Sequence, residues 1–70
     1  MNEIDKLRVL IPHWIEHNLE HAGEFSDWAR QAGEAAPEIL VAADQMAQVN
    51  EALEAALKKL GGPLDYHHSH

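Results

Sequence analysis

Three histidines and three glutamates alternate along one short stretch of this 70-residue chain. The histidines are four residues apart, and each is followed three residues later by a glutamate. Residues three and four apart are neighbours on a helix surface, so a helix here carries a continuous row of imidazole and carboxylate groups. We call this set the ladder; it comprises His13, Glu16, His17, Glu20, His21 and Glu24.

The chemistry open to the ladder is the binding of a divalent transition metal. Two histidines at i and i+4 can chelate one ion, with a carboxylate as a third ligand or as the group that orients a ring. His13 and His21 would lie about 12 Å apart along the helix axis, so all three histidines cannot serve one ion. The usable pairs are His13 with His17 and His17 with His21. Nickel, zinc and copper all fit these ligands.

A second group of histidines lies near the end of the sequence. After Gly61-Gly62-Pro63, three of the last four residues are His67, His68 and His70. Short His-rich tracts are typical of labile metal binding, although a cloning remnant has a similar composition. Seven extended residues span roughly 23 Å. We therefore expect residues 63–70 to form a flexible tail that supplies ligands to the ladder.

The ladder also has a purely structural interpretation. Solvated His–Glu pairs on a helix contribute only about 0.2–0.5 kcal/mol each. The string H-x-x-E-H, present at 13–17 and 17–21, also occurs in inverzincin proteases. A protease needs a third ligand, a cleft and a longer chain, which excludes that reading. The sequence shows no nucleophile–base pair or phosphate loop, and the second helix has no histidine for a ferritin-like site, so we expect no enzyme.

Two helices are expected to position these residues. Strand formers are few, and helix formers dominate the chain, which favours an all-α fold. Breaks at Pro12, at 33–37 and at 61–63 leave helix-like stretches at about 12–32 and 36–60. Asn2 is a candidate N-cap, and Gly61 a candidate helix terminator. Residues 4–11 form a short N-terminal helical segment, and Pro12 either kinks one long helix or separates this segment from the next.

The apolar residues of each stretch fall on one stripe, so the two stretches can pair as an antiparallel hairpin over residues 1–62. Asn18 lies inside the first stripe and Asn50 at the edge of the second, and we expect a hydrogen bond between them. The expected pairing sets residues against each other at five levels: Ala29 with Ala42, Phe25 with Met46, Ala22 with Val49, Ile15 with Ala56, and Ile11 with Leu60.

The apolar arc of the first helix is wider than one partner helix can cover. Leu10, Trp14 and Trp28 flank its stripe and extend the arc to roughly half the wheel. A second copy of the chain would cover them if two hairpins formed a four-helix bundle, as a two-fold homodimer. The alternative is that the N-terminal segment folds back over these residues. His17 and His21 border the surface that would meet the second copy.

Composition excludes several classes of function. The formal net charge is −7, and only five Lys and Arg are scattered along the chain, so nucleic acid is not an expected partner. The absence of cysteine excludes disulfides and thiolate ligands. No stretch approaches the roughly 18 apolar residues of a membrane span, and the acidic start is unlike a signal peptide. We expect a cytoplasmic protein without membrane contact.

The run from Leu7 through Phe25, with P-H-W-I-E-H-N at 12–18, resembles a group of small prokaryotic helical proteins and domains of uncharacterised activity. The resemblance covers about the first half of the chain. It implies no activity, but it favours treating the ladder histidines and Asn18 as one unit.

Two functions are compatible with these observations. The first is a small transition-metal-binding protein acting as a carrier, buffer or accessory factor, with the ladder and the tail as ligands. The second is an interaction module that docks a partner protein through Trp14 and Trp28 and leaves its histidines solvated.

Overall fold

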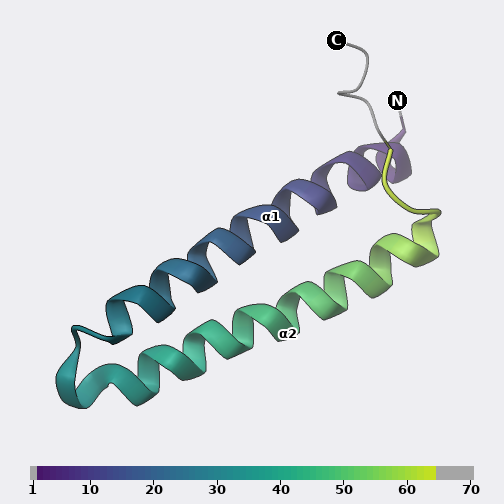
Figure 1. Cartoon of the computed structure of the whole chain (residues 1–70). Coiled ribbons are helices and arrows are strands. Elements are labelled where there is room, and N and C mark those ends of the chain that lie inside the picture. The colour runs from purple at the N-terminus through teal and green to yellow at the C-terminus, as the bar shows by residue number, and fades with distance from the viewer. Residues whose placement is uncertain (1, 65–70) are drawn as a thin grey trace, which may run out of the picture.

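The computed structural model describes residues 2–64, and these form an antiparallel hairpin of two long helices. Helix α1 spans Glu3–Ala29, a short 3-10 turn η1 spans Gly33–Ala35, and helix α2 spans Ala36–Leu60. The two helices lie side by side along their whole length, and residues 61–64 return to the beginning of α1 (Figure 1). The all-α hairpin is therefore confirmed for this part of the chain, which contains no strand.

Helix α1 begins at the expected cap and continues through Pro12 without a break. The Oδ1 atom of Asn2 accepts a 2.7 Å hydrogen bond from the Asp5 N–H, which satisfies one of the free donors at a helix start. Pro12 has no N–H to donate to the Arg8 carbonyl one turn earlier. That carbonyl instead accepts a 3.2 Å hydrogen bond from the Leu64 N–H. A separate N-terminal segment is thus excluded, because residues 4–11 are the first turns of α1.

The connection between the helices is tighter than the sequence indicates. Helix α1 ends at Ala29, three residues earlier than expected. Backbone bonds from Gln31 to Trp28 and from Ala32 to Ala29 close the end of the helix with three-residue spacing, as 3-10 turns do. Gly33 follows with a φ of 58°, a conformation that favours glycine. The chain thereby reverses direction within a few residues.

Helix α2 has the expected bounds, and local chemistry explains both ends. Pro37 lies in its first turn, where a missing N–H costs nothing. Lys58 and Lys59 lie in the last turn and complement the helix dipole. Gly61 terminates the helix at a φ of 113°, and its N–H bonds back to the Leu57 and Lys58 carbonyls.

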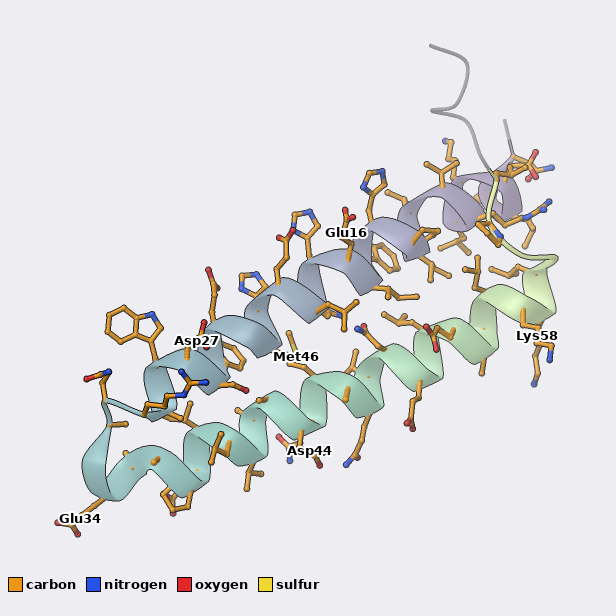
Figure 2. The ribbon with its side chains drawn as sticks, viewed as in Figure 1. Glu16, Asp27, Glu34, Asp44, Met46 and Lys58 are labelled. Atoms are coloured by element: carbon orange, nitrogen blue, oxygen red, sulfur yellow. The ribbon has the colours of Figure 1, made fainter. Side chains whose placement is uncertain are left out.

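The core between the helices is narrow. Its buried apolar residues are Ile11 and Ala29 of α1 and Leu57 of α2, and Met46 points from α2 toward α1 (Figure 2). The predicted positions of Val49 and Ala56 in this core are wrong, since both are exposed. Asn50 and Leu57, one residue further on, are buried in their place. Leu57 also belongs to the predicted apolar stripe of α2, so the prediction fails only at Val49 and Ala56.

A polar layer fixes the middle of the hairpin. Asn18 donates a 3.0 Å hydrogen bond from Nδ2 to Oδ1 of Asn50, as expected. Asn50, only 6% exposed, also donates from its own Nδ2 to the Ile15 carbonyl at 3.1 Å. Among the described residues no buried side-chain polar atom lacks a partner. This layer holds the two helices in one register, because any slip leaves a buried amide unsatisfied.

Candidate functional site

All six ladder residues lie on the unbroken middle part of α1, and all are exposed. The stripe of α1 that faces α2 is occupied by apolar residues and Asn18, so the ladder falls on the remaining surface of the helix. Glu16 points away from α2 (Figure 2). The ladder is thus open to solvent and to any ion or second molecule.

One ladder pair is in direct contact. His21 Nδ1 lies 3.1 Å from Glu24 Oε1, with the two side chains 55% and 66% exposed. The His21 ring also stacks on Phe25, with 6.3 Å between ring centroids. When Nδ1 carries the ring proton and donates it to Glu24, Nε2 keeps the lone pair that binds a metal. In that tautomer Glu24 orients the His21 ring.

Within residues 2–64, no three His, Asp or Glu side chains converge in a way that could hold a metal ion. The helix geometry explains this, because a rise of about 1.5 Å per residue spreads the ladder along the axis. A single helix brings two imidazoles to one ion, and further ligands must come from another segment or another chain. The predicted tail ligands His67, His68 and His70 lie outside the described residues.

The ladder histidines adjoin large apolar residues on one flank of α1. Leu10, Trp14 and Trp28 are 42%, 43% and 69% exposed, as expected for residues that α2 does not cover. Two histidines and a glutamate lie on the same side of α1, separated from these residues by four or three positions in the sequence. We call this set the outer stripe; it comprises Leu10, Trp14, His17, His21, Glu24 and Trp28.

Helix α2 adds apolar residues to the same side of the hairpin. In each helix the residue before a buried one is exposed and apolar: Leu10 before Ile11, Trp28 before Ala29, Val49 before Asn50 and Ala56 before Leu57. Both helices are right-handed and they run antiparallel, so a step back of one residue turns about 100° toward the same side of the hairpin in each. The outer stripe with Val49 and Ala56 forms one surface, here called the outer face.

Sequence reasoning missed the way residues 61–64 are attached to α1. Arg8 Nε donates a 2.6 Å hydrogen bond to the Gly62 carbonyl, and Nη2 donates at 3.1 Å to the Gly61 carbonyl. The Leu64 N–H completes the set by bonding to the Arg8 carbonyl. We call these contacts the anchor. Pro12 is the sequence signal that could have revealed it, because a proline inside a helix frees the carbonyl four residues earlier.

The anchor determines where the chain leaves the hairpin. Leu64 is attached five residues before His13, or about 7.5 Å along the axis of α1. Leu64, the last residue that the structure describes, therefore lies near the His13 end of the ladder.

The fold and the exposed ladder define a helical-hairpin protein with a histidine-rich surface. A family model described as a domain of unknown function (DUF8180) matches residues 7–60, and the chain belongs to this family. The match covers nearly the whole hairpin and is consistent with a small protein of uncharacterised activity. No curated protein and no solved structure gives a significant match. Neither helix in residues 2–64 has the length of apolar sequence that a bilayer crossing requires.

Proposed function

We propose that this protein is a small cytoplasmic transition-metal-binding protein, a carrier, buffer or accessory factor for nickel, zinc or copper. It acts as a homodimer in which two hairpins form a four-helix bundle. His13, His17 and His21 provide imidazole ligands, and Glu16, Glu20 and Glu24 serve as ligands or orient the rings. His67, His68 and His70 add ligands from the tail.

The observation that carries this proposal is the exposure of every ladder residue along one continuous helix. Exposed imidazoles spaced by one turn of a helix can bind one ion in pairs. His21 also has its carboxylate orienter in place, in the arrangement common around metal-ligating histidines. Because the set of ligands on one helix is incomplete, the ion must recruit others, and such a site exchanges metal more readily than a closed one.

The anchor supports a contribution from the tail. Leu64 is attached beside the start of the ladder, and six further residues can span at most about 20 Å. That length reaches His13 and His17 along α1. Binding is expected to release protons, because only neutral imidazole binds a metal.

Calorimetry on the full chain, purified without a nickel column, tests this function with Ni²⁺, Zn²⁺ and Cu²⁺ in turn. Two variants divide the ligands: H13A/H17A/H21A removes the ladder, and H67A/H68A/H70A removes the tail imidazoles. We expect the native chain to bind more tightly than about 10 μM, and each variant to bind at least tenfold more weakly. Weak binding by the native chain contradicts the function. If only the tail variant loses metal binding, the ladder is not part of the metal site.

A second function, a protein-interaction module without metal chemistry, is favoured by the exposed fractions of Trp28 and Val41, 69% and 55%. Photocrosslinking in cells from a probe at position 41, on the back of α2, distinguishes it. A discrete product with a different protein that persists in the ladder variant H13A/H17A/H21A supports this second function. A product that disappears in the ladder variant supports the metal-binding function.

A further inference from the structure

We infer that a second copy of the chain covers the outer face in antiparallel orientation, so that His17 and His21 of both copies bind one metal ion at the two-fold axis. This inference rests on the proposed function and specifies its site. It assigns the missing ligands to the partner copy, and gives the outer face a single occupant.

The order of residues in the outer stripe supports the antiparallel orientation. Reversal of the stripe about the level of residue 19 places Leu10 against Trp28, Trp14 against Glu24, and His17 against His21 of the other copy. A two-fold interface requires this reciprocity, because residue i meets residue j and j meets i. The apolar residues then lie toward the two ends, and the four imidazoles meet at the centre.

The ligand count also becomes sufficient. One hairpin offers two adjacent imidazoles, His17 and His21, and no three-ligand group within residues 2–64. Two copies offer four imidazoles, and nitrogen ligands in that number suit zinc, nickel and copper. Glu24 keeps its contact with His21 Nδ1 and leaves Nε2 directed to the ion. His13 lies off the outer stripe and takes no part in this site.

The outer face has the size and composition of an interface. The hairpin measures 47 × 27 × 14 Å, so its broad face exceeds the roughly 800 Å² per partner of a standard interface. Exposed tryptophans are enriched in such interfaces. The outer stripe itself carries one acidic residue, Glu24, and no lysine or arginine, so its centre contains little charge that burial would penalise.

Net charge indicates that the metal controls the association. Each copy carries a formal charge of −7, and two such copies repel one another. A divalent ion at the axis offsets part of this repulsion and crosslinks the copies. Since the ion binds the pair more tightly than the single chain, it shifts the equilibrium toward the dimer by mass action. Dimerisation and metal binding are therefore one coupled event.

Mass in solution tests the coupling, in the full-length H67A/H68A/H70A background so that tail imidazoles do not contribute. We expect one chain per particle with EDTA at 20 °C and about 10 μM protein. With Zn²⁺ we expect two chains and one zinc per particle. H17A and H21A should each raise the zinc needed for dimerisation at least tenfold, whereas the control Q48A, at an exposed position of α2 outside the ladder, should not. Circular dichroism verifies that each variant remains helical.

Cysteine crosslinking tests the orientation, because the chain has no cysteine of its own. A Leu10→Cys chain mixed with a Trp28→Cys chain should form a disulfide-linked pair with Zn²⁺ under mild oxidation. Neither chain alone should do so. Pairing of either variant with itself indicates a parallel arrangement and overturns the inference.

The remaining outcomes separate the inference from the proposed function. Zinc binding by single chains, or a zinc-induced dimer that neither H17A nor H21A weakens, overturns the shared site but leaves metal binding intact. If the dimer persists in EDTA and is unaffected by H17A and H21A, the coupling between metal binding and dimerisation is overturned. The absence of zinc, nickel and copper binding in the native chain overturns both.

Discussion

Two adjacent stripes of α1 have the same periodicity but opposite surroundings. The inner stripe contains Ile11, 3% exposed, and Asn18, whose amide is paired with Asn50. The outer stripe begins one residue earlier, at Leu10, 42% exposed, and ends at Trp28, 69% exposed. Both stripes follow steps of three and four residues, so sequence periodicity alone cannot show which of them is buried in the core.

The difference arises from the number of helices available. One partner helix covers an arc of about 100° on its neighbour, and α2 covers the inner stripe. The outer stripe keeps both its apolar residues and its imidazoles exposed to solvent. In the proposed dimer, the outer stripe is where the second hairpin packs to complete a four-helix bundle. The polar groups of the inner stripe are hydrogen-bonded between the two helices, whereas the His21–Glu24 contact of the outer stripe lies on the surface.

The largest expected difference between the two stripes comes from truncating neighbouring residues. Ile11→Ala should lower the free energy of unfolding by about 2–5 kcal/mol, enough to unfold much of a chain this small. Leu10→Ala should cost less than about 1 kcal/mol, because this residue is already 42% exposed. Urea denaturation with EDTA at low protein concentration measures both, and Ile11→Val provides a milder inner variant. Equal costs for the two alanine variants would mean that the outer stripe is covered even without metal.

The polar layer of the inner stripe should show the next largest effect. Asn18→Ala leaves the Asn50 Oδ1 atom buried without its donor, at a cost of about 1–3 kcal/mol. Gln48→Ala, which removes an exposed i, i+4 contact with Asp44, is the control and should change stability by less than about 0.5 kcal/mol. A double substitution of Asn18 and Asn50 to Leu should recover stability but loosen the register. A cost for Asn18→Ala no larger than the control contradicts a structural role for this layer.

The anchor should contribute less, and its effect should be local. Arg8→Ala removes both side-chain bonds to the Gly61 and Gly62 carbonyls, and should cost about 1 kcal/mol since the guanidinium is partly hydrated. Lys6→Ala, at an exposed position two residues earlier, is the control. Hydrogen exchange at the Leu64 amide should accelerate in Arg8→Ala and not in Lys6→Ala.

Pro12→Ala should weaken the anchor but stabilise α1. An alanine restores an N–H that competes for the Arg8 carbonyl, so exchange at Leu64 should accelerate while the overall helix becomes more stable. Unchanged exchange at Leu64 would mean that the carbonyl freed by Pro12 does not hold the end of the hairpin.

The smallest structural effect is expected for the exposed contact of the outer stripe. Glu24→Gln should change metal-free stability by less than about 0.5 kcal/mol, because both side chains of the His21–Glu24 pair are more than half exposed. Metal affinity should fall about 10-fold or more, since the carboxylate orients the ring. Denaturation and calorimetry on the same variant separate the two roles. A change in stability without a change in affinity would assign Glu24 a purely structural role.

Local sequence signals were sufficient for most of the architecture. The composition and the breaks at 33–37 and 61–63 predicted two helices, and the bounds of α2 agree with that prediction. The Asn2 cap, the Gly61 terminus and the Asn18–Asn50 bond were also predictable, because each depends on residue type and helical spacing. The ladder could be placed on a helix for the same reason.

Tertiary structure decided what spacing left open. The sequence could not show that Val49 and Ala56 stay exposed, since both lie beside buried positions of the same helix and fit its apolar periodicity. It could not show that Pro12 is accommodated by Leu64, a partner more than fifty residues away. Both features depend on how the two helices pack: which distant residues come within hydrogen-bonding distance, and how wide an arc of α1 the helix α2 covers. Only the folded hairpin therefore determines which stripe of α1 stays exposed.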